Sequence, residues 1–110
     1  MSVSLIKLIE DAAKNIAHLG FAIRKESLSD VPQVRICIDD VMHIESELDK
    51  LGDGEQIVCA KNRMNLFKLV EGIRSAYENT DLVTLADILE YELLHELEKI
   101  LNKLKADYNV

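Results

Sequence analysis

Residues 82–106 read LVTLADILEYELLHELEKILNKLKA and form the longest amphipathic segment of the chain. Apolar side chains recur there every three or four residues, which is the spacing of one face of an α-helix. The recurring residues are Leu82, Leu85, Ala86, Leu89, Leu93, Leu97, Ile100 and Leu104. Asn79, Thr80 and Asp81 stand just before the segment and supply a helix cap. The pattern therefore predicts a helix over residues 82–106.

Three earlier segments carry the same spacing. It predicts helices over about residues 4–25, from about residue 32 to Gly52, and from about Glu55 to Tyr77. The expected core positions of these helices are Leu5, Leu8, Ile9, Ala12, Ile16, Leu19 and Ile23; Val34, Ile38, Val41, Ile44, Leu48 and Leu51; and Ile57, Ala60, Met64, Phe67, Val70, Ile73 and Tyr77. Gly52-Asp53-Gly54 is the strongest turn signal between them.

The composition supports a helical domain with short connections. The chain has 110 residues, of which 48% are hydrophobic, and it contains only four glycines and one proline. Short connections make neighbouring helices run antiparallel. We therefore expect an all-α fold, an antiparallel up-down-up-down four-helix bundle that occupies residues 1–110 as a single domain.

Four charged residues lie inside the predicted apolar faces: Glu45, Arg63, Arg74 and Glu90. A buried charge is costly unless an opposite charge meets it. In an antiparallel hairpin, two residues are level when their numbers sum to twice the number at the turn. This rule brings Glu45 near Arg63 and Glu90 near Arg74, so we predict both as ion pairs in the structural core.

Glu92 and His95 have the Glu-x-x-His spacing that forms half of a di-iron site in some helical bundles. Asp40 and His43 repeat the spacing on the second helix. At about 100° per residue, His43 and His95 lie opposite the apolar faces of their helices, and His18 is outward too. These side chains are expected to point into solvent, so we predict no metal and no cofactor.

Catalysis by a nucleophile is not indicated either. Cys37 and Cys59 fall on apolar faces, and no histidine is placed to activate them. Antiparallel packing would set the two several turns apart, so both are predicted to be free thiols. The glycine turn lacks the Lys-Ser/Thr of a phosphate-binding loop, and Glu96 and Glu98 are assigned to a solvated face. We expect a protein that is not an enzyme.

The charge balance disfavours two classes of partner. Twenty acidic and 13 basic residues give a net charge of −7, which repels nucleic acid and anionic membrane surfaces. The first residues, MSVSLIKLIEDAAK, lack the features of a signal peptide, and no apolar run approaches the length of a membrane span. We therefore expect no nucleic acid or membrane partner and a cytoplasmic location.

A second, shorter stripe runs along the helix predicted over residues 82–106. Thr84, Ile88, Tyr91 and His95 fall at i, i+4, i+7 and i+11, away from the main apolar face. Scattered surface hydrophobic residues are normal and would explain it equally well. The other interpretation is a partner interface, in which this face packs against a second copy or another protein.

Residues 80–94, TDLVTLADILEYELL, resemble a signature of small, uncharacterised, acidic helical proteins and domains of Gram-positive bacteria. The resemblance covers about fifteen residues and contains no catalytic motif. It implies a bacterial helical domain of unknown function. The plan of a small acidic bundle that ends in a long helix rich in Leu and Glu is also similar to that of flagellar export chaperones, a likeness of architecture alone.

The function expected from the sequence is non-enzymatic. We predict a cytoplasmic helical-bundle protein that acts through protein–protein contacts, as a homodimer, an adaptor or a chaperone-like module. The alternative is a small-molecule or metal-binding bundle with a polar internal site built on the inward charges. In that case Arg63 or Arg74 would face a cavity, whereas in a structural core both would pair with carboxylates.

Overall fold

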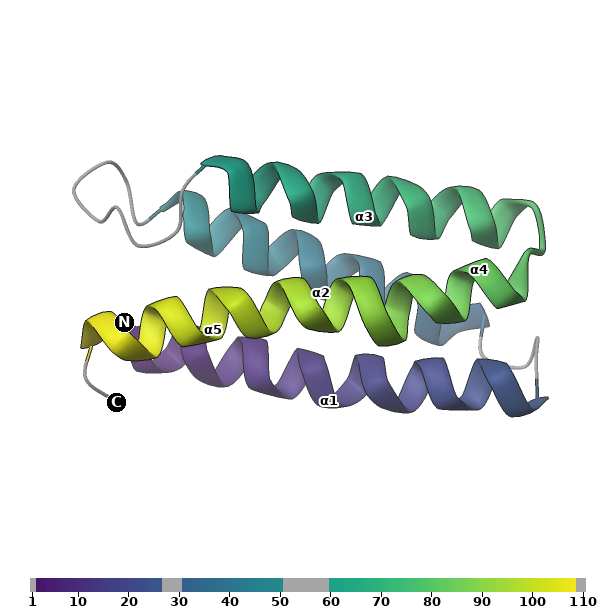
Figure 1. Ribbon diagram of the computed structural model, residues 1–110, viewed down its shortest axis with the longest axis horizontal. Coiled ribbons are helices and arrows are strands. Elements are labelled where there is room, and N and C mark those ends of the chain that lie inside the picture. The colour runs from purple at the N-terminus through teal and green to yellow at the C-terminus, as the bar shows by residue number, and fades with distance from the viewer. Residues whose placement is uncertain (1, 27–30, 51–59, 109–110) are drawn as a thin grey trace.

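The structure is a computed structural model that describes residues 2–26, 31–50 and 60–108. Within these ranges the chain is helical and has no strand, which confirms the predicted all-α class. The elements are α1 (Ser2–Glu26), α2 (Val31–Asp49), α3 (Ala60–Glu78), α4 (Leu82–Asp87), a π-helical segment called η2 (Ile88–Leu93), and α5 (Leu94–Tyr108). The last three follow one another without a break and form one rod (Figure 1). Gly52-Asp53-Gly54 and Cys59 lie outside the described residues.

The four rods lie lengthwise beside one another (Figure 1). α1 packs against α2 on one side and against the α4–η2–α5 rod on the other, and α3 also packs against α2 and this rod. In the described part of the chain, no close backbone approach joins α1 to α3 or α2 to the rod, so these pairs are diagonal. The molecule measures 42 × 22 × 19 Å. The arrangement is compatible with a four-helix bundle.

Two ion pairs show how α1 lies along the rod. Glu10, near the start of α1, accepts from Lys105 near the end of α5, with 3.0 Å between Oε2 and Nζ. Arg24, near the end of α1, contacts Asp87 near the beginning of the rod. The beginning of one element is thus beside the end of the other.

The core is aliphatic and continuous along the bundle. Its largest side chains with less than 2% of their surface exposed are Ile9, Ile16, Val41, Ile44, Leu66, Ile73, Leu85, Leu89, Leu93, Leu97, Ile100 and Leu104. Most of these positions follow the predicted stripes. Burial of such side chains is the main stabilising term in the fold.

On α3 the predicted stripe is wrong at two positions. Met64 and Phe67 are 57% and 43% exposed, whereas Leu66 and Val70 are buried. Both sets have helical spacing, so periodicity alone does not separate them. Val70 and Ile73 are buried as predicted, and the buried stripe reaches them through Leu66 and continues to Ala76.

The η2 segment changes the phase of the rod. A π-helical turn pairs each N–H with the carbonyl five residues back, so it contains more residues than an α-turn. As a result Ile88, Leu89 and Leu93 are all buried within one turn and a half. Ile88 reaches α3 where Gly72 leaves room: a Cβ at Gly72 would lie 3.2 Å from Ile88 Cδ1.

The predicted cap of the rod is present. The Asp81 side chain accepts a hydrogen bond from the Thr84 backbone N–H at 3.2 Å. Hydrogen bonding to the Thr84 side chain, and then to this backbone N–H, lowers the pKa of the Asp81 carboxyl. Thr80, one residue earlier, has a φ of 55°. None of the helices in the described ranges combines the length and apolar character needed to cross a membrane.

Candidate interaction surface

Arg63 on α3 contacts two carboxylates of α2. Its Nη1 lies 3.7 Å from Glu45 Oε1 and 2.5 Å from Asp49 Oδ1. The side chains of Arg63 and Glu45 are 30% and 13% exposed, so the contact lies at the edge of the α2–α3 seam. Arg63 is therefore within ion-pair distance of Glu45, and Asp49, which was not predicted, is the closer partner.

The prediction that Glu90 pairs with Arg74 is wrong. Glu90 Oε1 accepts from Arg24 Nε of α1 at 2.8 Å, and Arg74 is exposed on α3. Matching levels along two helices fixes the heights of two residues but not the directions of their side chains. The π-helical turn directs Glu90 toward α1, where its Cγ would lie 2.5 Å from a Cβ at Gly20.

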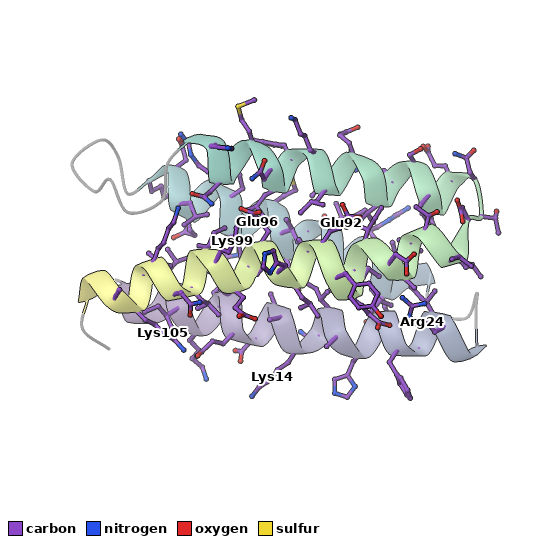
Figure 2. The ribbon with its side chains drawn as sticks, in the orientation of Figure 1. Lys14, Arg24, Glu92, Glu96, Lys99 and Lys105 are labelled. Carbon is purple, nitrogen blue, oxygen red and sulfur yellow. The ribbon has the colours of Figure 1, made fainter. Side chains whose placement is uncertain are left out.

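Arg24 is held by two carboxylates of the rod. Its Nη2 donates to Asp87 Oδ1 at 2.6 Å, in addition to the contact of Nε with Glu90. The hydrogen bond to Asp87, followed by that to Glu90, raises the pKa of the guanidinium above its usual value. The guanidinium carbon also lies 5.7 Å from the centre of the Tyr91 ring, a cation–π distance. Figure 2 shows Arg24 between α1 and the rod.

Two aromatic side chains are exposed beside this arginine. Tyr91 of η2 is 65% exposed, and Phe21 of α1, which precedes Arg24 by one helical turn, is 56% exposed. We call Phe21, Arg24 and Tyr91 the aromatic patch. Tyr and Arg are the residue types enriched at the energetic centres of protein interfaces, and here the arginine is already fixed by ion pairs.

The predicted interface stripe on the rod is only partly exposed. Thr84, Tyr91 and His95 are exposed, but Ile88 is 7% exposed and belongs to the core. A straight α-helix would place Ile88 on the same face as Tyr91, whereas the π-helical turn carries it to α3. The stripe is therefore interrupted, and Tyr91 shares its surroundings with α1 instead.

Glu96 of α5 is 6% exposed, which contradicts its assignment to a solvated face. Asn62 and Asn65 of α3 donate to its two carboxylate oxygens at 3.0 and 3.4 Å, and Lys99 Nζ lies 3.5 Å away. Lys103 Nζ donates to the side-chain amide oxygen of Asn62, Oδ1, at 3.0 Å. Figure 2 shows Glu96 and Lys99 on the rod near α3.

This polar network keeps Glu96 ionised. Burial is the largest influence on the carboxyl and acts against ionisation, but the hydrogen bonds from Asn62 and Asn65, together with Lys99, outweigh it and lower the pKa of Glu96. The spacing contained a signal for its burial: Glu96 follows Leu93 by three residues and precedes Ile100 by four, as an inward position does.

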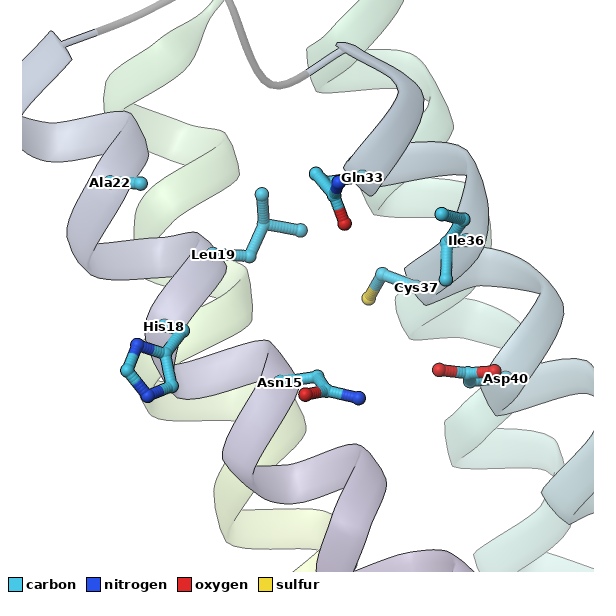
Figure 3. A pocket seen from close by; sticks show the side chains of 8 residues that line it. All are labelled: Asn15, His18, Leu19, Ala22, Gln33, Ile36, Cys37 and Asp40. Carbon is cyan, nitrogen blue, oxygen red and sulfur yellow. The ribbon is translucent and has the colours of Figure 1, made fainter.

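A groove of about 390 Å³ lies between the facing surfaces of α1 and α2 (Figure 3). Cys37 points into it, while His18 lies on its rim and turns away. Burial, assisted by the negative charge of Asp40, raises the pKa of the Cys37 thiol to about 12. The thiol is free and stays protonated near neutral pH, so it has no nucleophilic character there.

A second groove of about 390 Å³ runs between α2 and α3. Its apolar floor includes Val34 and Ile38, and Arg35, Arg74 and Glu78 are among its charged lining residues. Arg74 therefore faces a groove. For the residues that the structure describes, no group of three or more His, Cys, Asp or Glu side chains is placed to hold a metal ion.

Comparison with known protein families places the chain in one of them. The profile of a family described as "Domain of unknown function (DUF8042)" matches residues 3–103, which is most of the chain and includes the aromatic patch. No curated protein and no solved structure matches the chain significantly.

Proposed function

The chain belongs to the DUF8042 family of domains of unknown function, and we propose that it is a non-enzymatic helical-bundle protein that acts through protein–protein contacts. The observation that supports this most is the aromatic patch. Phe21 and Tyr91 expose more than half of their surface. Arg24 of α1 is held by Asp87 and Glu90 of the rod.

The patch suits binding because its central cation is ordered before a partner arrives. Association costs free energy for each long side chain that it immobilises. Arg24 has already lost this freedom to its two ion pairs. Tyr91 adds a large apolar surface with a hydroxyl that can stay in contact with water. Docking of a partner would therefore bury aromatic area at a low cost in side-chain entropy.

We infer that the bundle presenting this patch is antiparallel, with up-down-up-down topology. The support lies in the contacts of α1 with the rod, where Glu10 meets Lys105 and Arg24 meets Asp87, and in the contact of Arg63 on α3 with Asp49 on α2. With α4, η2 and α5 counted as one rod, each pair joins the beginning of one rod to the end of another. We place the protein in the cytoplasm, where a free cysteine such as Cys37 persists.

The experiment compares the proteins captured from the cells of origin by three forms of the full chain. The double variant Phe21→Ser/Tyr91→Ser is expected to lose a partner that the wild type retains. Val83→Ser is the matched control, because Val83 is 70% exposed on α4 and lies outside the patch. An identical set of captured proteins for all three forms would contradict the use of this patch.

A small-molecule site is the second candidate, and Arg74 is the observation that favours it. Arg74 and Arg35 line the α2–α3 groove above an apolar floor, together with Asp39 and Glu78, and the two arginines are the groups that would bind the anionic end of an amphiphile. Against an internal site, no buried side-chain nitrogen or oxygen among the described residues lacks a partner. Stabilisation of the wild type by a small carboxylate or phosphate in a thermal-shift assay, lost in Arg74→Gln, would support this candidate.

A further inference from the structure

The outer face of α3 carries two large apolar side chains that the core does not use. Met64 is 57% exposed and Phe67 is 43% exposed. They are three residues apart, so they are neighbours on one side of the helix. Leu66 and Ile73, which α3 contributes to the core, are on the opposite side and are 1% and 0% exposed.

Opposite charges flank this apolar pair. Lys61 precedes Met64 by one turn, and Glu71 follows Phe67 by one turn; both are exposed. Read along the helix, the face runs from Lys61 through the apolar pair to Glu71, and Lys68 lies beside the apolar pair. Such an order is complementary to its own reverse, which is the order presented by a second copy related by a two-fold axis.

We propose that the outer face of α3 binds the same face of a second copy in an antiparallel, two-fold symmetric pair. The register follows from placing Met64 level with Phe67 of the other copy. In this register the Met64 and Phe67 side chains of both copies are removed from water. Lys61 is then level with residue 70 of the other copy, one residue and about 1.5 Å from Glu71. The pairing thus combines a central apolar cluster with two Lys61–Glu71 contacts.

The other charges near this face are compatible with the pairing. Arg63 is turned toward α2, where it contacts Glu45 and Asp49. Lys68 precedes Glu71 by three residues on the same helix, so Glu71 lies between Lys68 and Lys61 of the second copy and offsets the repulsion between these two cations.

This inference goes beyond the proposed function and concerns a separate surface. The aromatic patch is built on α1 and the exposed side of η2, whereas α3 packs against η2 through its buried side and carries Met64 and Phe67 on its exposed side. A pair formed through α3 leaves both copies of the aromatic patch open. Such a pair would present the patch twice, which increases avidity for a partner that is itself repeated.

The test is sedimentation of the full chain at micromolar concentrations. Wild type is expected to associate as dimers. Lys61→Glu and Glu71→Lys each place like charges together, and each is expected to raise the dissociation constant by about tenfold. The double variant Lys61→Glu/Glu71→Lys restores opposite charges and should dimerise again.

Mixing the two single variants gives the sharpest result. One copy then carries acidic side chains at both positions 61 and 71, and the other carries lysines at both. The mixture should therefore form heterodimers, although each variant alone is expected to be mostly monomeric. Lys7→Glu on α1 and Glu98→Lys on α5 are matched controls, because both positions are exposed and off the face. Circular dichroism confirms that each variant is folded.

A wild type that is monomeric overturns the proposal and leaves the face to a different protein. A dimer that is insensitive to these charge reversals, or single variants that do not associate when mixed, overturns the register and the face. None of these outcomes bears on capture through the aromatic patch, so the two proposals fail independently.

Discussion

Gly20 and Glu90 approach so closely that a Cβ at position 20 would lie 2.5 Å from Cγ of Glu90. Gly20→Ala should therefore destabilise the protein by about 1–3 kcal/mol, although alanine normally stabilises the interior of a helix. Urea unfolding measures this change. In a Glu90→Ala background the same substitution should be neutral or stabilising, and an unchanged penalty there would show that Glu90 is not the obstacle.

Removal of the buried carboxylate at Glu96 should leave the side-chain amides of Asn62 and Asn65 without an acceptor. We expect Glu96→Ala to lower the free energy of unfolding by about 1–3 kcal/mol at neutral pH. Glu98→Ala, two residues away and exposed, is the control and should change it by less than about 0.5 kcal/mol.

The same carboxylate predicts a pH dependence. The pKa of Glu96 is lowered in the folded protein, so its contribution is fully present above the unfolded value of about 4.3 and is lost as the pH falls through the lower folded value. Wild type should therefore lose stability in acid more steeply than Glu96→Gln. Parallel urea midpoints across this range test the prediction, and equal slopes would contradict it.

Thr80 adopts a φ of 55°, which a β-branched residue rarely adopts. Thr80→Asn should stabilise the protein by about 0.5–1 kcal/mol, because asparagine tolerates this conformation. The melting temperature reports the gain. The same change at Thr84, inside α4, should give no gain, which separates relief at position 80 from a general effect of asparagine.

Arg63 and Arg74 should differ in their contribution to stability. Arg63 contacts the mostly buried Glu45 as well as Asp49, so Arg63→Met should cost about 1 kcal/mol, less than for a deeply buried pair because Arg63 itself is 30% exposed. Arg74→Met, at an exposed site, should be neutral within about 0.5 kcal/mol. Equal costs for the two substitutions would mean that the ion pairs of Arg63 with Glu45 and Asp49 add nothing to the free energy of unfolding.

The helical class and most core positions could be predicted from the sequence, because aliphatic residues such as Leu85, Leu93 and Leu104 recur at one period with few interruptions. The buried positions in the first turns of α3 could not, since Phe67 precedes Val70 by three residues and Leu66 precedes it by four, and both spacings are helical. Only the packing of the whole bundle selects between two such stripes.

The partner of Glu90 was unpredictable for a different reason. The height of a residue along a helical hairpin follows from its number alone. The direction of its side chain around the helix axis is predicted only by assuming a constant 3.6 residues per turn. The π-helical turn between Ile88 and Leu93 has more residues per turn than this value. No residue type in the segment predicts such a turn. The burial of Ile88 and the pairing of Glu90 with Arg24 both depend on that turn.

A chain of this family with one residue fewer between Asp87 and Leu94 could replace the π-helical turn by an α-helical one and keep both flanking cores in register. Aligned with this protein, it would show a single gap there. A deletion of one residue elsewhere in the rod would instead rotate every later side chain by about 100° and turn Leu97 and Ile100 away from the core. The rod is therefore expected to tolerate the loss of one residue at η2 better than the same loss between Leu94 and Leu97.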